Sequence, residues 1–164
     1  MPRDLYMKYT LFGVGIILLD QVSKWIVRTA MSVGESIPVL GDFFRLTYVR
    51  NTGAAFSMLS GERLLLVILP LVVVTGAFWY FWTHPGKHRL FYISWSMIIA
   101  GGIGNLIDRA VFGWVTDMLD FSIFPPVFNV ADVGVTVGCG LFMYYILMEE
   151  RLQKHERERT EIRN

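Results

Sequence analysis

Aspartates in apolar surroundings are the residues of this 164-residue sequence with the clearest capacity for chemistry. Four lie in or beside apolar stretches, namely Asp20, Asp108, Asp117 and Asp132, and Asp120 is close by. An ionised carboxylate in hydrocarbon costs at least about 2.5–3.5 kcal/mol on the membrane-insertion scale. Each of these carboxyls is therefore expected to be paired, hydrated or protonated.

Two of the acids have a cation close in sequence. Asp20 and Lys24 are spaced i, i+4, so on a helix they meet on one face. This spacing fits either a buried ion pair that orients the helix or a brace for a functional site. Asn105, Asp108 and Arg109 are spaced i, i+3, i+4 and also share a helix face. That group fits either a structural hydrogen-bond cluster or a substrate-binding role.

Asp117 and Asp132 have no obvious cation beside them. Asn129 precedes Asp132 at i−3 and shares its face, and the segment between the two acids contains Pro125-Pro126. A turn there can fold the chain back and set the two carboxyls side by side. Taken singly, Asp132 also fits a helix N-cap and Asp117 an exposed loop acid. The residues alone do not choose between Asp117 and Asp120, which follows it at i+3.

Two neighbouring carboxyls would support acid–base hydrolysis. Carboxyls about 3 Å apart cannot both ionise, so they share a proton. One then acts as general base toward a water and the other as general acid. This chemistry requires no metal and no cofactor, and we expect neither. His84, His88 and His155 lie in segments that the charge pattern, described below, predicts to be cytoplasmic, away from these acids. The single Cys139 excludes a multi-cysteine metal site.

The composition indicates that these acids are positioned by a membrane protein. Hydrophobic residues make up 54% of the chain, charged residues only 18%, and the mean hydropathy is +0.46. Soluble domains carry about 25% charged residues. A disordered chain is excluded because such chains lack apolar residues. A soluble globular protein is nearly excluded because too few polar residues remain to cover its surface. The net charge of +1 gives no case for binding nucleic acid.

Apolar windows predict four transmembrane helices in a single membrane domain, residues 1–164. A helix that rises about 1.5 Å per residue needs roughly 20 residues to cross the hydrocarbon. Three windows carry no charged residue, and a fourth is interrupted by Asp20 and Lys24. The predicted helices span about residues 9–28, 64–82, 90–108 and 131–149.

Lys and Arg set the predicted orientation. They are concentrated at the N-terminus, in the turn 83–89 and in the tail 150–164, so both termini are expected in the cytoplasm. Segments of about 29–63 and 109–131 then face outward. The first mixes β-branched and aromatic residues around a Gly41-Asp42 turn, which predicts a short β-sheet between the first two helices. The second is predicted as a loop, and the fold class is a helical membrane core with a small β element.

Five segments of the sequence resemble the lipoprotein signal peptidase (signal peptidase II) family, the membrane aspartic endopeptidases of bacteria. They are LDQVSK at 19–24, NTGAAFS at 51–57, GGIGNLIDR at 101–109, VTDM at 115–118 and FNVAD at 128–132. They occur in the family's order and cover nearly the whole chain. GNLIDR together with FNVAD is the specific part of the match.

The resemblance implies a catalytic dyad of Asp117 and Asp132, and the VTDM match favours Asp117 over Asp120. It further implies that nine positions build or support the site: Asp20, Lys24, Asn51, Gly53, Asn105, Asp108, Arg109, Asn129 and Ala131. Asn105, Arg109 and Asn129 are expected to contact the substrate backbone or the catalytic carboxyls. Segment 29–63 resembles the family's surface β-cradle and segment 109–131 its mobile flap.

The implied substrate is a prolipoprotein that already carries diacylglycerol on its lipobox cysteine, and the enzyme cuts just before that cysteine. It would act after a prolipoprotein diacylglyceryl transferase, among membrane lipids, and would be inhibited by globomycin-type compounds. The implied location is the bacterial cytoplasmic (inner) membrane, with the site near the extracytoplasmic face. The alternative is a small ion- or proton-conducting protein that uses its intramembrane aspartates.

Overall fold

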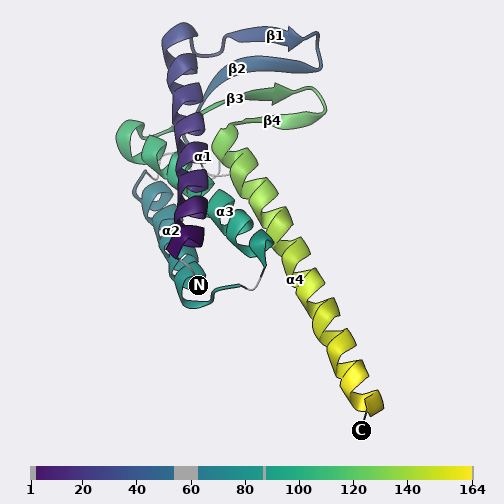
Figure 1. The fold of residues 1–164 in the computed structure, drawn as a ribbon. Helices are drawn as coiled ribbons and strands as arrows, with labels where there is room; N and C mark the ends of the chain where they lie inside the picture. Colours follow the sequence, from purple (N-terminus) through teal and green to yellow (C-terminus); the bar gives the residue numbers. More distant parts are fainter. Residues whose placement is uncertain (1–2, 54–62, 87, 164) are drawn as a thin grey trace.

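The computed structural model describes residues 3–53, 63–86 and 88–163. Its helices are α1 (Arg3–Ala30), α2 (Arg63–Thr83), α3 (Arg89–Phe112) and α4 (Val130–Arg163). Its strands are β1 (Ser36–Leu40), β2 (Phe44–Asn51), β3 (Val115–Phe121) and β4 (Phe124–Phe128). The helices form a bundle with the sheet across one end, and both chain ends lie away from the sheet (Figure 1).

All four predicted helices are present, and each begins and ends within a few residues of the prediction except α4, which continues through the charged tail. Within the described residues, three helical stretches are long and apolar enough to cross a membrane: Tyr6–Ala30, Arg89–Phe112 and Val130–Lys154. The apolar part described for α2, Val67–Thr83, is shorter. The structure therefore supports a multi-pass membrane protein.

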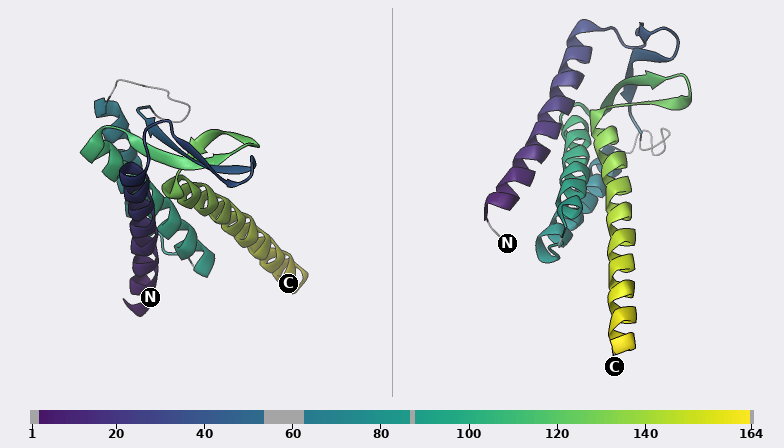
Figure 2. Two further views of the ribbon diagram at one scale, coloured as in Figure 1. Left: turned by 90° about the horizontal axis from the view of Figure 1, so that it is seen from above. Right: turned by 45° about the vertical axis from the view of Figure 1, so that its right-hand side comes forward.

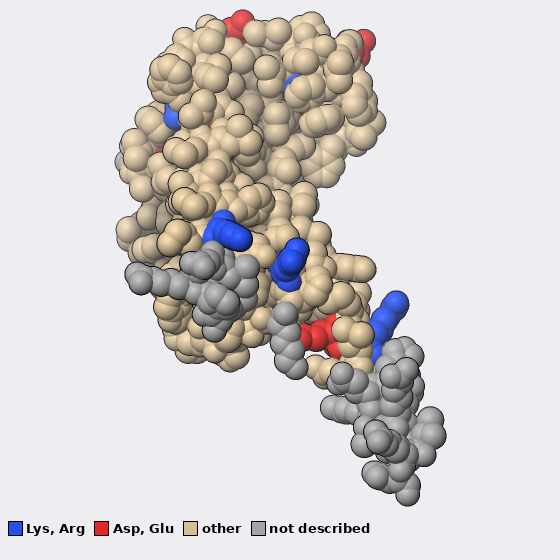
Figure 3. All heavy atoms as spheres, viewed as in Figure 1, with Lys and Arg blue, Asp and Glu red and all other residues tan. Residues whose placement is uncertain are grey.

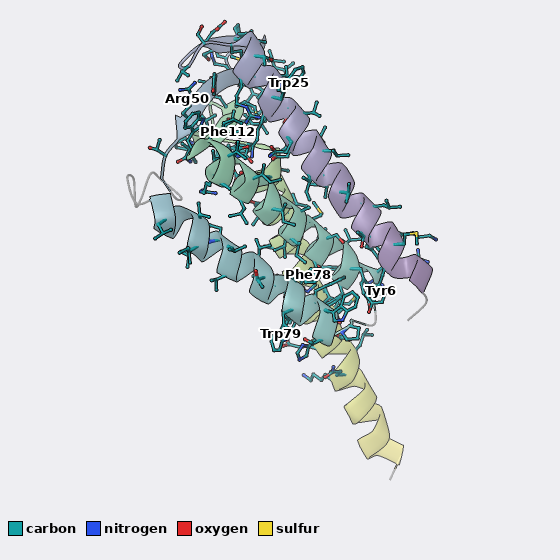
Figure 4. The ribbon with its side chains drawn as sticks, turned by 90° about the vertical axis from the view of Figure 1, so that its left-hand side faces the viewer. Tyr6, Trp25, Arg50, Phe78, Trp79 and Phe112 are labelled. Carbon is teal, nitrogen blue, oxygen red and sulfur yellow. The ribbon has the colours of Figure 1, made fainter. Side chains whose placement is uncertain are left out.

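The outer faces of the helices are apolar. Trp25 is 60% and Trp79 65% exposed, and both point away from the bundle (Figure 4). Exposed apolar surface of this extent is expected of helices that face lipid. On the face drawn in Figure 3, acidic and basic side chains gather toward the two ends of the molecule.

The sheet differs from the prediction. Its four antiparallel strands run in the order β1-β2-β3-β4, so half of it comes from segment 109–131, which was expected to be a loop. The predicted sheet between the first two helices is only β1 and β2. Val49 of β2 lies opposite Asp117 of β3, and α4 starts directly below β4 (Figure 2).

Pairing explains why this segment forms strands. The residues VTDMLDF of β3 are β-branched or apolar at most positions, and they pair with β2 on both sides of a register shift between Leu46 and Val49. Pro125 and Pro126 lack a backbone N–H, but they lie in β4 at the sheet edge, between the two positions at which β4 pairs with β3, where the register shifts. The prolines are therefore compatible with a strand although they exclude helix.

The close contact between α3 and α4 depends on Gly101. An alanine there is expected to destabilise the protein by about 1–3 kcal/mol, because its Cβ would clash with the backbone oxygen of Ala131 and lie 2.8 Å from Val135 Cγ2. The matched control is Gly140→Ala on α4, where a Cβ meets nothing within 4 Å. Unfolding in detergent measures both variants, and equal midpoints would contradict the close approach.

Candidate active site

Asp117 lies on β3 with its side chain turned into the protein, where it is 2% exposed. Its Oδ1 accepts a hydrogen bond of 2.6 Å from Asn129 Nδ2. Its Oδ2 accepts one of 3.1 Å from Asn51 Nδ2, at the end of β2. Two amides from different elements therefore hold both oxygens of this carboxyl.

Asp132 lies in the first turn of α4 and shares a capping arrangement with Asn129. Asn129 Oδ1 accepts from the backbone N–H of Asp132 at 3.0 Å, and Asp132 Oδ2 accepts from the backbone N–H of Asn129 at 3.2 Å. This reciprocal pattern is a capping box. The N-cap suggested for Asp132 is therefore wrong, because Asn129 occupies that position.

Asn129 thus connects the two acids that sequence reasoning left without a cation. Its amide nitrogen donates to Asp117 and its amide oxygen fixes the turn that carries Asp132. Burial raises the pKa of Asp117 to about 6, and the nearby charge of Asp132 adds to the rise. The hydrogen bonds from Asn129 and Asn51 act in the opposite direction because they favour the ionised carboxylate.

Asp120 lies on the same strand as Asp117 but bonds to a different partner. Side chains alternate between the two faces of a strand, so residues three apart point to opposite faces. Asp120 Oδ2 accepts a hydrogen bond of 2.6 Å from Thr47 Oγ1 on β2. Of the two candidates that the residues left open, the structure brings Asp117 to Asn129 and Asp132.

Lys24 links α1 to Asp132 through the side chain of Asn105. The predicted i, i+4 pair is confirmed, with Lys24 Nζ 2.9 Å from Asp20 Oδ2 and neither residue exposed to solvent. The same ammonium donates to Asn105 Oδ1 at 2.9 Å. Since the amide oxygen of Asn105 is held by Lys24, its nitrogen is directed to Asp132 Oδ1, at 2.7 Å. The ion pair therefore both orients α1 and orients a hydrogen-bond donor to Asp132.

Asp20 ties α1 to the start of α4. Its Oδ1 accepts from the backbone N–H of Ala131 at 2.9 Å, and Ala131 is completely buried. A Cβ at Gly104 would lie 2.6 Å from Asp20 Oδ2 and 3.1 Å from the Cβ of Ala131. Small residues at positions 104 and 131 therefore permit this carboxylate to reach the helix terminus.

Asn105, Asp108 and Arg109 share the predicted helix face but have different partners. Asp108 is fully buried, and its Oδ2 accepts from the backbone N–H of Thr116 at 2.9 Å, directly before Asp117. Arg109 Nη2 donates to the carbonyl of Gly53 at 3.5 Å. Its Nε is buried and has no hydrogen-bond partner among the described residues.

Of the NTGAAFS motif at 51–57, the structure describes residues 51–53. Asn51 Oδ1 accepts from the backbone N–H of Gly53 at 3.1 Å, so one amide side chain both shapes the end of β2 and reaches Asp117. Residues 54–57 of the motif lie outside the described residues.

Sequence reasoning missed two residues that join these elements. Arg28 Nη1 donates to Thr116 Oγ1 at 3.2 Å and to Asp108 Oδ1 at 3.4 Å, and its guanidinium lies 4.5 Å from the centre of the Phe112 ring. Gln21 Nε2 donates to the carbonyl of Gly104 at 3.0 Å. Arg28 follows Lys24 at i+4, so the spacing that revealed the Asp20–Lys24 pair also places it on that face.

An apolar cavity of about 460 Å³ adjoins the acids. Aromatic side chains of the β3–β4 hairpin form one wall and α4 forms the other. Its lining includes Phe121, Phe124, Phe128, Asp132, Val133 and Val137. Asp132 is the carboxyl in this wall, so an apolar ligand in the cavity would lie against an acid of the pair.

Comparisons with known proteins show the family to which this chain belongs. The family model described as signal peptidase (SPase) II matches residues 12–148. The lipoprotein signal peptidase of Halothermothrix orenii is 44% identical over 137 residues, which cover 84% of this chain and 93% of that protein. That of Halalkalibacterium halodurans is 40% identical over 154 residues, covering 92% and 99%.

A solved structure described as a bacterial membrane enzyme at 2.3 Å resolution superimposes with a TM-score of 0.82 and 32% identity. The match covers 87% of this chain and 89% of the solved chain. The resemblance seen in the five sequence motifs is confirmed, and the chain belongs to the signal peptidase II family.

Proposed function

We propose that this protein is a membrane-embedded aspartic endopeptidase that removes the signal peptide from diacylglyceryl-modified prolipoproteins, just before the lipidated cysteine. Membership of the signal peptidase II family makes it a peptidase of lipoprotein precursors. The aspartic mechanism is supported by one observation above all: Asn129 joins Asp117 to the turn that carries Asp132. These acids gather at one end of the bundle, which does not favour a proton path across the membrane.

In the mechanism that we propose, the pair holds one proton. One aspartate removes a proton from a water, the water attacks the scissile carbonyl carbon, and the other aspartate protonates the departing amine. The titration belongs to the pair, so neither acid is assigned as the base. Asn105 and Asn129 keep the carboxyls oriented, and Arg109, which donates to the carbonyl of Gly53, is proposed as a further contact to the substrate backbone.

The substrate's apolar parts are proposed to lie in the cavity beside Asp132. An acyl chain or an apolar signal segment is excluded from water there, and binding energy gained away from the reacting atoms can hold the peptide bond at the acids. The lining of Phe121, Phe124 and Phe128 supports this assignment.

The membrane arrangement is also a proposal. α2 is taken as a fourth transmembrane helix, both termini as cytoplasmic, and residues 1–164 as one domain of the bacterial inner membrane. The sheet end, with Asp117 and Asp132, then faces the extracytoplasmic side, and support comes from the position of both chain ends at the opposite end (Figure 1). Because its substrate must be lipidated, the enzyme acts after a diacylglyceryl transferase, and globomycin-type inhibitors should compete for the site.

The function is tested with purified protein and two forms of one preprolipoprotein, with and without diacylglycerol on the cysteine. Cleavage of the lipidated form alone, before that cysteine, is expected, with inhibition by globomycin and none by pepstatin. Equal cleavage of both forms would contradict the proposed substrate, and cleavage of neither would contradict the activity.

The pH dependence of cleavage is expected to follow the proton of the pair. The pKa of Asp117 is raised to about 6, so its carboxyl keeps a proton up to about that pH. As pH rises further the pair loses its proton, and kcat/KM should fall. The hydrogen bond from Asn51 lowers this pKa, so Asn51→Leu should move the alkaline limb to higher pH. If the alkaline limb of the kcat/KM profile of Asn51→Leu coincides with that of the wild type, the hydrogen bond from Asn51 does not lower the pKa of Asp117.

Arg28 is expected to be a positioning residue for Asp117. Arg28→Gln removes its bonds to Asp108 and Thr116, the residue before Asp117, and should lower kcat about tenfold with little change in KM. Arg28→Lys should recover part of the loss, which a purely structural defect would not predict. Arg45→Gln is the control, because Arg45 is partly exposed and its partners Asp42 and Ser36 belong to the β1–β2 hairpin. Equal effects of Arg28→Gln and Arg45→Gln would contradict this role.

A further inference from the structure

A second cavity lies at the end of the bundle away from the sheet. Its volume is about 360 Å³, within the range of small-molecule sites. The turn between α2 and α3 forms one side and α4 the other. The lining residues that matter for its chemistry are Tyr80, His84, Phe91, Phe142, Tyr145 and Glu149.

The aromatic wall of this cavity is a packed unit. Phe91 is 3% and Tyr145 6% exposed, and their ring centres are 5.6 Å apart. Trp95, behind the wall, lies 5.0 Å from the Phe142 ring and 5.4 Å from the Tyr80 ring. These contacts hold rings from three helices in place, so the shape of the wall does not depend on a ligand.

Gly86 and His88, which lie in the connection between α2 and α3, each take part in a hydrogen bond with the first turn of α3. Tyr92 Oη donates to the carbonyl of Gly86 at 2.8 Å, and His88 Nδ1 accepts from the backbone N–H of Leu90 at 3.2 Å to cap α3. A Cβ at Gly86 would clash with the ring of Phe91. Glycine therefore permits the turn to lie directly against the aromatic wall.

The charge of the cavity favours a cation. The face of an aromatic ring carries negative charge density and attracts ammonium groups. Glu149 is half-buried and adds a carboxylate, for which the described residues provide no hydrogen bond or ion pair. An apolar occupant would remove water from this carboxylate without replacing it, which is unfavourable. The exposed part of Tyr80, whose ring stacks on His84 with centres 4.5 Å apart, and the carboxylate of Glu149 are together suited to an alkylammonium group.

The position of the cavity identifies where such a group would come from. The apolar span of α3 begins at Arg89 and that of α4 ends at Lys154, shortly after Glu149. The cavity is therefore level with the lipid headgroups rather than with the acyl chains. Arg89 and Arg151 are exposed close in sequence to lining residues and are suited to a phosphate. Tyr6, Phe78 and Trp79 mark the same end of the bundle (Figure 4).

We propose that this cavity binds the headgroup of an amine-bearing phospholipid, with the ammonium group between the aromatic rings and Glu149. The site is separate from the aspartate pair at the sheet end (Figure 1). It would anchor the α2–α3 turn and α4 to the membrane surface, and it does not depend on the peptidase mechanism.

Calorimetric titration of the purified full chain in detergent tests the site. The probes are dihexanoyl phosphatidylethanolamine, dihexanoyl phosphatidylglycerol and free phosphoethanolamine. The amine lipid is expected to bind at least about tenfold more tightly than the glycerol lipid. Phosphoethanolamine should compete weakly if the headgroup is the recognised part, whereas equal binding of both lipids would overturn the proposal in favour of an acyl-chain site.

Two variants locate the site. Glu149→Gln is expected to weaken binding of the amine lipid about tenfold, whereas Glu150→Gln, at the exposed neighbouring position, should leave it unchanged. Tyr80→Leu should weaken it as well, through loss of a ring face. Cleavage of lipidated substrate should be normal in Glu149→Gln, which separates this test from that of the proposed function. Unchanged binding in both Glu149→Gln and Tyr80→Leu would overturn the proposal.

Discussion

Asp117→Asn and Asp132→Asn are each expected to reduce cleavage of a lipidated prolipoprotein by about 10³-fold or more. An asparagine can hold neither the proton nor the negative charge that the pair must exchange with water and the leaving amine. The measurement is single-turnover cleavage of a diacylglyceryl-modified substrate in detergent or bilayers. Asp120→Asn is the matched control, because Asp120 is on the same strand but bonds to Thr47 on β2.

Normal turnover by either variant would remove that acid from the mechanism, provided that the protein is folded. Stability gives an independent check for Asp117. Its pKa is raised from 3.8 to about 6 in the folded protein, so between these values the folded chain holds a proton that the unfolded chain has lost. Wild-type stability therefore falls as pH rises through this window. Asp117→Asn should lose that part of the pH dependence while remaining folded.

Lys24→Met is expected to be the most destabilising single substitution, at about 3–5 kcal/mol. It leaves Asp20 and Asp108 buried without the ammonium that lies 2.9 Å from the first and 3.6 Å from the second. It also frees the amide of Asn105, so Asp132 loses an oriented donor and activity should fall with stability.

The control for Lys24→Met is Arg45→Gln. Arg45 is partly exposed, lies 3.9 Å from the exposed Asp42 and donates to Ser36 Oγ at 2.7 Å. A partly solvated ion pair contributes about 1 kcal/mol or less and such a hydrogen bond about 0.5–1.5 kcal/mol, so this loss should be the smaller one. Unfolding free energy in mixed detergent measures both variants. A loss with Lys24→Met that is no larger than that with Arg45→Gln would show that the buried acids are neutral or hydrated. The double variant Asp20→Asn/Lys24→Met should recover part of the stability, because one uncompensated charge is removed.

Local spacing accounts for what was predicted well. A helix fixes the relation between residues four apart, so the sequence already places Lys24 against Asp20. Apolar windows, three of them without charge and one interrupted by Asp20 and Lys24, predict the four helices because helix formation and apolar patterning are both local in sequence. The motifs were sufficient to indicate the family and, through it, Asp117 in preference to Asp120.

Contacts between segments that are distant in sequence could not be predicted from the sequence and are seen only in the tertiary structure. Segment 109–131, predicted as a loop, forms two strands. β3 pairs with β2, whose residues are far away in sequence, and β4 pairs in turn with β3. The same pairing turns Asp117 inward and Asp120 toward Thr47. Residue types do not reveal such a choice, since both acids lie on one strand and each is followed by an apolar residue, Met118 or Phe121.

The sequence by itself determined the helices, the Asp20–Lys24 pair and the set of acids. Only the tertiary structure decided that Asn129 connects Asp117 to the turn of Asp132, that Asn105 is oriented by Lys24, and that Arg28 reaches the residue before Asp117. The physical reason is that an amide or guanidinium is directed by partners on other elements. Those partners come within hydrogen-bonding distance only after the helices and the sheet have packed together.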